Sequence, residues 1–211
     1  MAAFAKKKDS KTMSIIDAVK SFIYLLSSCL LYPDLILLAL LSAWVVVLAG
    51  RFAAEWMERR GLKKAGSGEI KKLIKEGNLS GIFSHAPISY IEKLREAFGN
   101  GNPGAEALEY MLQKETAALQ ASLDTLRIFI KTGPALGLIG TLIPMSTGLA
   151  ALGKGNINSL SADLVVAFTT TVVGLFIGVS SYFIYMVRKR WIEEDVRNIE
   201  FATEILHSEI S

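Results

Sequence analysis

The chain has 211 residues, of which 51% are hydrophobic, and its mean hydropathy is +0.38. These values are too apolar for a soluble domain of this size, and the apolar residues gather in blocks, so the composition indicates an integral membrane protein. The net charge of +3 provides no general basic field, which argues against nucleic acid as a partner. The single cysteine excludes an internal disulfide framework.

Residues 1–32 are expected to form a polar, lysine-rich tail followed by an amphipathic helix at the membrane interface. Apolar residues recur there at helical spacing: Ile15, Ile16, Val19, Phe22, Ile23 and Leu26. A secretory signal peptide is the competing interpretation of a basic start before an apolar run. No small-residue cleavage pattern follows, and another apolar block begins at once, which favours the interfacial helix.

Residues 33–56 are predicted to form the first transmembrane helix. We expect Pro33 to end the preceding helix and to begin this one, which places Asp34 near its positive N-terminal end. Leu35 to Gly50 is uncharged for 16 residues, and the segment reaches spanning length if Arg51 extends its charged group toward the interface.

Residues 57–131 are expected to form a cytoplasmic helical region. Counted from Arg51, near the end of the first predicted span, to Lys131, the sequence contains 13 Lys/Arg and 10 Asp/Glu. Short helices are predicted at 69–76 and 88–98, a loop at 99–104, and a helix from Ala105. The apolar spacing of that last helix reaches the membrane, so we expect it to continue into the second span without a break.

Two further spans are predicted, at 132–153 and 164–187, joined by an outer loop at 154–163. The first runs for 22 uncharged residues and the second for 24. At a rise of about 1.5 Å per residue, each can cross a hydrocarbon core of roughly 30 Å. Residues 188–211 contain no Gly or Pro and are expected to project as a charged cytoplasmic helix. The predicted fold is therefore all-α, with three transmembrane helices and long cytoplasmic helical extensions.

The distribution of basic residues predicts the orientation. The region before span two is rich in Lys and Arg, and Arg188-Lys189-Arg190 follows span three, whereas the short loop between these spans has only Lys154. The positive-inside rule places the C-terminus in the cytoplasm and, with three spans, the N-terminus outside. The N-terminal lysines disagree, but a tail of about a dozen residues can be translocated.

The residues for soluble-enzyme chemistry are sparse. His85 and His207 are the only histidines, no Cys/His pair has metal-binding spacing, and no phosphate-binding glycine loop occurs. We therefore expect no enzymatic activity, no metal and no cofactor.

Small and hydroxyl-bearing residues distinguish spans two and three from ordinary lipid-facing helices. Residues 132–148 contain two prolines, four glycines and four hydroxyl residues. Span three places small residues on one face, flanked by Thr169 and Thr170: Leu164, Ala167, Thr171, Gly174, Gly178 and Ser181. Such a pattern allows close helix packing or a polar pathway, and the residue types alone leave both open.

Two motifs carry a resemblance to a known family. The run Gly137-Leu138-Ile139-Gly140-Thr141, preceded by Pro134, and the run Ala167-Phe168-Thr169-Thr170-Thr171-Val172-Val173-Gly174-Leu175 resemble the two signature segments of the MotA/TolQ/ExbB proton-channel family. The three-span layout also resembles that of TolQ and ExbB.

This resemblance implies an ion-driven membrane motor of the cytoplasmic membrane, powered by H⁺ or Na⁺. It implies a homopentamer whose spans two and three line a pore around two copies of a single-span ExbD/TolR/MotB-like partner, which supplies an aspartate. The residues that match the family motifs, and are expected to line the pore, are Thr141, Thr171, Thr170, Pro134, Gly137, Gly174 and Gly178. The alternative is a non-conducting membrane scaffold in which these residues only pack a helical bundle.

One position departs from the family pattern. TolQ and ExbB usually carry a glutamate five residues before the span-three threonine, where this chain has Val166. We therefore expect the chain to have no carboxylate of its own at membrane depth, so that the charged group must come from another chain. Asp163 is expected to be a helix N-cap or a charge at the outer mouth.

Overall fold

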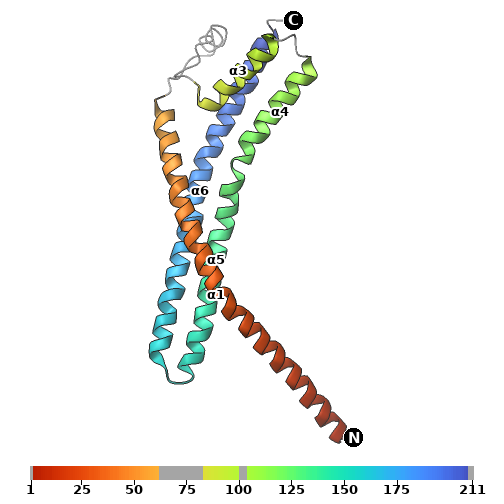
Figure 1. The fold of residues 1–211 in the computed structure, drawn as a ribbon, viewed down its shortest axis with the longest axis vertical. Helices are drawn as coiled ribbons and strands as arrows, with labels where there is room; N and C mark the ends of the chain where they lie inside the picture. Colours follow the sequence, from red (N-terminus) through yellow and green to blue (C-terminus); the bar gives the residue numbers. More distant parts are fainter. Residues whose placement is uncertain (1, 62–82, 100–103, 209–211) are drawn as a thin grey trace. The chain divides into compact units, whose positions relative to one another are not determined.

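The computed structural model describes residues 2–61, 83–99 and 104–208, and these residues form helices without any strand. The predicted helix at 69–76 lies outside the described residues. The helices, shown in Figure 1, are α1 (Ala2–Arg60), α3 (His85–Gly99), α4 (Ala105–Ala121), α5 (Asp124–Leu152) and α6 (Ile157–Ser208). The all-α class predicted from the sequence is thus confirmed.

Three helical stretches of the described chain are long and apolar enough to cross a membrane: Cys29–Arg60, Ala105–Leu152 and Ile157–His207. Their most apolar windows have mean hydropathies of 2.3, 1.7 and 2.0, respectively. This result agrees with the three spans expected from the sequence. Helix α6 continues without interruption to Ser208, which confirms that span three extends into the charged C-terminal segment as one helix.

The chain divides into two compact units. Unit 1 comprises Met1–Val45 and Phe129–Val179, and unit 2 comprises Val46–Ile128 and Ser180–Ser211. The long helices α1, α5 and α6 each contribute one part to unit 1 and another part to unit 2.

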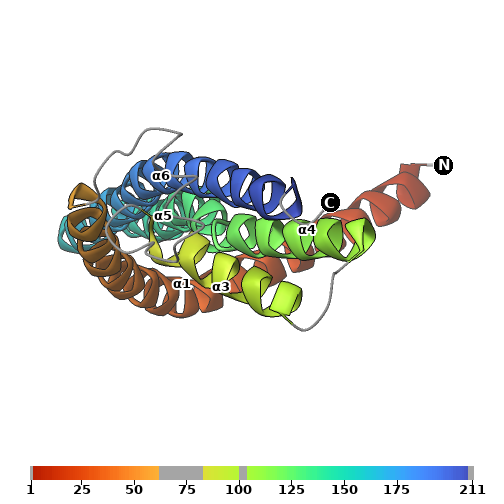
Figure 2. The ribbon, with the colours of Figure 1, turned by 90° about the horizontal axis from the view of Figure 1, so that it is seen from above.

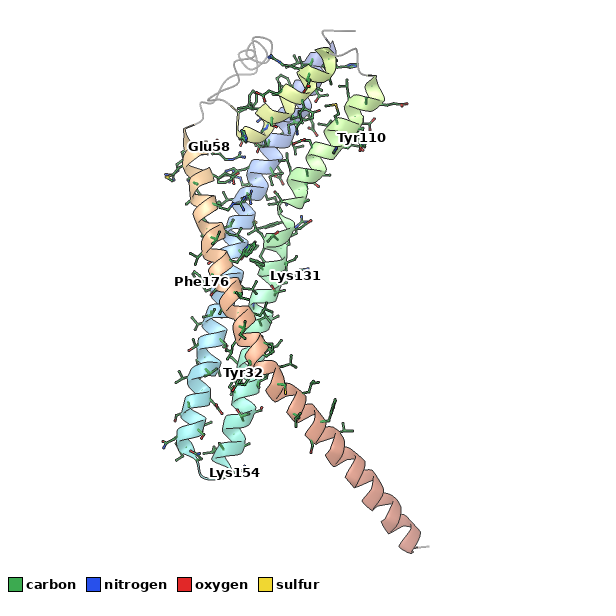
Figure 3. All side chains as sticks on the ribbon, in the orientation of Figure 1. Tyr32, Glu58, Tyr110, Lys131, Lys154 and Phe176 are labelled. Carbon is green, nitrogen blue, oxygen red and sulfur yellow. The ribbon has the colours of Figure 1, made fainter. Side chains whose placement is uncertain are left out.

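Unit 1 contains an antiparallel hairpin of α5 and α6, visible as the two adjacent helices in Figure 1. Four residues, 153–156, connect the helices, and Lys154 marks this closed end in Figure 3. Gly155 has a φ of 79°, a conformation that favours glycine. The Asn156 Oδ1 atom accepts a hydrogen bond of 3.1 Å from the Ser159 amide and so caps α6. The loop is shorter than the predicted segment 154–163 because α6 begins at this cap.

Helix α1 runs through Pro33, so the prediction of a helix break at this residue was wrong. A proline inside a helix removes one backbone hydrogen bond, here to the carbonyl of Cys29, and the φ angle of proline is itself helical. Spans tolerate this loss where the flanking sequence continues to be helical and apolar. Asp34 is consequently an interior residue of α1, on the buried face that also carries Leu38 and Val45.

Unit 2 has a core formed by α3, α4 and the C-terminal part of α6, which lie together in Figure 2. Its fully or largely buried members include Ile91, Leu94, Leu108 and Ile199. The helix predicted at 88–98 is confirmed within α3, and α4 begins at Ala105 as predicted. Burial raises the pKa of the Tyr90 phenol, whose oxygen lies 3.0 Å from the Thr203 hydroxyl.

The helix predicted to run unbroken from Ala105 into span two is interrupted by a turn at Ser122 and Leu123. The Ser122 hydroxyl donates to the Leu119 carbonyl at 2.6 Å, and the Leu123 amide donates to the Gln120 carbonyl at 3.0 Å. These bonds tighten the end of α4 before α5 starts at Asp124. Leu123 is 3% exposed within a second apolar cluster of unit 2, so tertiary packing stabilises a turn that the apolar spacing did not reveal.

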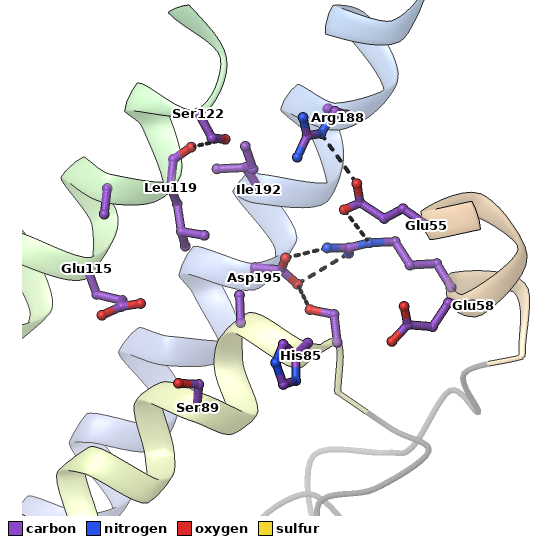
Figure 4. A pocket seen from close by; sticks show the side chains of 14 residues that line it. Glu55, Glu58, His85, Ser89, Glu115, Leu119, Ser122, Arg188, Ile192 and Asp195 are labelled. Carbon is purple, nitrogen blue, oxygen red and sulfur yellow. Dashed lines mark hydrogen bonds and ion pairs between the residues drawn. The ribbon is translucent and has the colours of Figure 1, made fainter. Parts of the chain in front are cut away.

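A buried ion pair joins three elements of unit 2 (Figure 4). The Asp195 carboxylate of α6 accepts hydrogen bonds from the Arg59 guanidinium, at 2.5 and 3.3 Å, and from the Ser84 hydroxyl at 2.7 Å. The guanidinium also lies 5.0 Å from the centre of the Trp191 ring. Asp195 is 3% exposed, and each of its carboxylate oxygens accepts a hydrogen bond in a site with little water.

We predict that Asp195→Ala destabilises the protein by about 3 kcal/mol or more, because it leaves the buried Arg59 with only Glu55 as an ionic partner. The control is Asp124→Ala, which removes an exposed ion pair with Arg127 and is expected to change stability by about 1 kcal/mol or less. The measurement is thermal denaturation of the purified variants in detergent. Equal losses for the two variants would contradict this view of the buried pair.

Candidate functional site

The two helices of the hairpin touch through their backbones. A Cβ atom at Gly174 of α6 would lie only 2.6 Å from the Gly133 carbonyl oxygen and 2.7 Å from the Gly137 Cα. A Cβ atom at Gly137 would lie 3.0 Å from the Thr170 carbonyl oxygen. Only residues without a side chain permit this approach, which is the usual function of small residues at helix contacts in membranes.

Pro134 packs on the same contact. A Cβ atom at Gly178 would lie 2.7 Å from the Pro134 Cγ, so the proline ring fills the space above this glycine. Within the single chain, four of the residues predicted to line a pore are therefore placed at the contact between α5 and α6: Pro134, Gly137, Gly174 and Gly178. Their lining of a pore in an assembly stays a prediction.

The motif threonines keep their hydroxyl groups close to their own helices. The Thr141 hydroxyl donates to the Leu138 carbonyl at 2.7 Å, and the Thr171 hydroxyl donates to the Ala167 carbonyl at 3.3 Å. Both side chains are half-buried. A hydroxyl that donates to the preceding turn retains its oxygen lone pairs, so both residues can still accept a hydrogen bond or coordinate a cation.

Thr170 is different because it is buried and faces a carboxylate. A point directly above Gly140, where a Cβ atom would be, lies 2.9 Å from the Thr170 Oγ1 and also 2.9 Å from the Asp34 Oδ2. Thr170 and Asp34 are each 5% exposed. Gly140 thus leaves room in which a carboxylate of α1 and a hydroxyl of α6 come together.

Asp34 contradicts the expectation that the chain has no carboxylate of its own at membrane depth. It lies inside a candidate span, against a residue near the middle of predicted span two and a residue of predicted span three. The sequence contained a signal: Asp34, Leu38 and Val45 follow helical spacing, so this aspartate shares the buried face of α1. Because a helix break was expected at Pro33, this helical spacing of Asp34 with Leu38 and Val45 was not recognised.

Asp163 does not cap α6, contrary to one of the two roles expected for it. It lies inside the helix, which begins at Ile157 after the Asn156 cap. Its Oδ2 accepts a hydrogen bond of 2.8 Å from the Thr147 hydroxyl of α5. Asp163 is half-buried, so this carboxylate is both hydrogen-bonded and partly hydrated.

The described residues contain no group of three or more His, Cys, Asp or Glu side chains arranged to hold a metal ion. Around the hairpin, the described residues of unit 1 provide hydroxyl groups, backbone carbonyls and the carboxylates of Asp34 and Asp163. These groups can bind or pass a small cation, and they lie among helices of spanning length. Fold and site together define an α-helical membrane protein whose hairpin is packed through glycines and carries buried polar groups.

Comparison with known proteins identifies the family. Residues 94–201, just over half of the chain, match the model of the MotA/TolQ/ExbB proton channel family, and the chain belongs to this family. It is also 30% identical over 122 residues to a biopolymer transport protein ExbB homolog of Methanothermobacter thermautotrophicus. The match covers 56% of this chain and 44% of the relative, so the chain aligns with less than half of that protein. No solved structure matches the chain.

Family membership confirms the resemblance found in the sequence motifs and, with the three apolar helices, identifies a multi-pass membrane protein. The matched region contains α4, α5 and α6 as far as Phe201, which includes the whole apolar part of α6. Asp34 lies outside it. The family match therefore covers the hairpin but leaves the carboxylate of α1 to be interpreted from the structure.

We predict that Gly174→Ala lowers the thermal stability of the protein in detergent, because its new methyl group would collide with the backbone of α5. Overpacking of this kind costs about 1–3 kcal/mol. Gly50→Ala, in α1, is the matched control, since no atom lies within 4 Å of its added Cβ and alanine favours a helix. Equal melting temperatures for the Gly174→Ala variant and the unmodified protein would show that the two helices are not in backbone contact.

Proposed function

We propose that the chain is the pore-forming subunit of an ion-driven membrane motor that uses H⁺ or Na⁺. The observation that carries this proposal is the threonine-bearing hairpin inside the region matched by the proton-channel family. Hydroxyl groups can donate and accept hydrogen bonds without a fixed charge, so they can pass or solvate a cation in an apolar environment.

The exposed surfaces of the hairpin support an assembly. Large apolar side chains of α5 and α6 are more than half exposed in the single chain: Leu138, Leu142, Leu149, Val165, Phe168, Val172, Phe176 and Val179. Such surfaces need lipid or other protein chains around them. We propose that some of them meet copies of the same chain in a homopentamer, while others face the bilayer.

The proposed partner is a single-span ExbD/TolR/MotB-like protein, present in two copies, with an aspartate in its membrane helix. The Thr141 and Thr171 hydroxyls, which retain free lone pairs, are suited to lie beside such a carboxylate. Ion flow supplies about 2.3 kcal/mol per charge per 100 mV, which is enough to bias the positions of helices. Movement of the partner would then perform the work.

We place the protein in the cytoplasmic membrane, with its N-terminus outside and its C-terminus in the cytoplasm. The basic residues before α5 and after the apolar part of α6 support this orientation. In this arrangement the short loop 153–156 lies outside, and the core of α3, α4 and α6 lies in the cytoplasm.

A non-conducting scaffold is the second candidate function. The observation in its favour is that Pro134, Gly137, Gly174 and Gly178 already pack against one another within a single chain. If helix packing accounts for every small residue of the motif, no pore is needed to explain them. The threonine hydroxyls separate the two functions, because a scaffold does not require them.

We predict that Thr141→Val combined with Thr171→Val reduces ion flux about tenfold or more while assembly is preserved. Valine keeps the shape of threonine but removes the hydroxyl, and a hydrogen bond to a charged group is worth about 1.5–3 kcal/mol. The protein is purified with its co-purifying membrane partner and reconstituted into liposomes, where H⁺ and Na⁺ uptake are measured separately.

The matched control is Thr169→Val, which removes an exposed hydroxyl of the same helix that donates to the Val165 carbonyl. We expect this variant to retain flux. Undiminished flux in the assembled double variant would reject the threonine-lined pore, and the absence of flux in the unmodified complex would favour the scaffold.

A further inference from the structure

The two buried aspartates of the described chain have opposite surroundings. Asp195 accepts hydrogen bonds from Arg59 and Ser84, whereas both carboxylate oxygens of Asp34 are buried without a hydrogen-bond partner. Asp34 is 5% exposed, so bulk water does not replace the missing donors. Since an ionised carboxylate without partners is strongly destabilised by burial, the site calls for a bound cation.

We propose that Asp34 is a proton-binding carboxylate that this chain itself supplies to the membrane, in a site shared with Thr170 and Gly140. Its role as a relay in ion flow rests on the proposed function, whereas its binding of a proton does not. The site lies wholly within unit 1, between α1 and the two helices of the hairpin.

The surrounding oxygen atoms can accept a hydrogen bond from the protonated carboxyl group of Asp34. Pro144 has no N–H to donate to the Gly140 carbonyl one turn earlier, so the helix leaves this carbonyl without its usual partner. Thr170 donates its own hydroxyl hydrogen to the Ala167 carbonyl at 2.8 Å and keeps lone pairs free. A protonated Asp34 can therefore turn its O–H group toward the Thr170 oxygen, which lies beside the same point above Gly140, while the Gly140 carbonyl lacks its usual donor.

The same atoms suit a proton better than a sodium ion. The oxygens nearest the point above Gly140 are the Asp34 Oδ2 and the Thr170 Oγ1, fewer than a metal ion needs to replace its hydration shell. A proton needs one oxygen and makes the carboxyl group neutral. The structure thus favours H⁺ as the ligand of this site.

No charged residue of the described helices lies within six positions of Asp34, Gly140 or Thr170 along the same helix. Helix α5 has no charged residue between Lys131 and Lys154, and α6 has none between Asp163 and Arg188. Along α1 the nearest charged residues are Lys20 and Arg51, each about 20 Å or more away at helical rise. Tyr32, the titratable neighbour on α1, is 73% exposed and so does not share the buried site.

The gap above Gly140 also explains how the carboxylate fits. An added Cβ at this position would lie 2.8 Å from the Thr170 Cβ as well as 2.9 Å from the Asp34 Oδ2. Any side chain at position 140 would therefore collide with the carboxylate of Asp34 and the hydroxyl of Thr170. The glycine of the motif run, Gly140, is a structural requirement of the site.

The test is labelling of the full chain in liposomes with dicyclohexylcarbodiimide, an apolar reagent that modifies protonated carboxyl groups. Mass spectrometry of peptides locates the label. We expect modification of Asp34 at a rate that falls as the pH rises and does not change when sodium chloride replaces choline chloride. Asp163, which is half-exposed and hydrogen-bonded, is expected to react at least tenfold more slowly.

Two matched variants complete the experiment. Asp34→Asn keeps the shape of the side chain and is expected to remove the label and to reduce proton flux about tenfold or more. Asp163→Asn neutralises a second carboxylate, on α6, and is expected to retain the label at Asp34. Because Asp34→Asn removes an unpartnered buried carboxylate, its melting temperature in detergent should equal or exceed that of the unmodified protein.

Asp34 unlabelled at every pH, or protected by sodium chloride, would overturn the assignment of a proton site. If Asp34→Asn retains full flux while the Thr141 and Thr171 double variant loses it, the relay role fails and the proposed motor function stands. If the unmodified complex shows no flux at all, the motor function fails, and the labelling still decides whether Asp34 binds a proton.

Discussion

The contact between the backbones of α5 and α6 is the constraint on which the rest of unit 1 depends. Gly174 of α6 lies so close to Gly133 and Gly137 that a single methyl group would collide with the backbone of α5. Because side chains are absent from this contact, the Thr170 side chain of α6 lies directly against Gly140 of α5. The carboxylate of Asp34, from α1, lies against the same glycine.

The carboxylate of Asp34 bears on the one position at which this chain departs from the family pattern. The resemblance to TolQ and ExbB implies a glutamate on span three at the position where this chain has Val166. Val166 precedes Thr170 by one helical turn, and Asp34 approaches Thr170 from another helix. The chain therefore contains a carboxylate near the position from which the motif lacks one, but supplies it from α1.

The sequence predicted the class and the elements because long apolar runs and helical spacing are strong local signals. Span number, the uninterrupted α6, the start of α4 at Ala105 and the family resemblance all followed from such signals. Two features depended on tertiary contacts and were missed. The turn at Ser122 and Leu123 interrupts a continuous apolar spacing, and Pro33 continues a helix that its residue type usually ends. The buried position of Asp34 was missed with it, since an aspartate near a supposed helix start is explained by the positive end of the helix dipole.

Infrared spectroscopy of the full chain in lipid at neutral pH tests the central claim most directly, because the carbonyl stretch of a protonated carboxyl group is distinct from the bands of a carboxylate. We predict one such band that shifts on exchange into heavy water, disappears in Asp34→Asn and persists in Asp163→Asn. Identical spectra for Asp34→Asn and the unmodified protein would contradict a proton bound at this site.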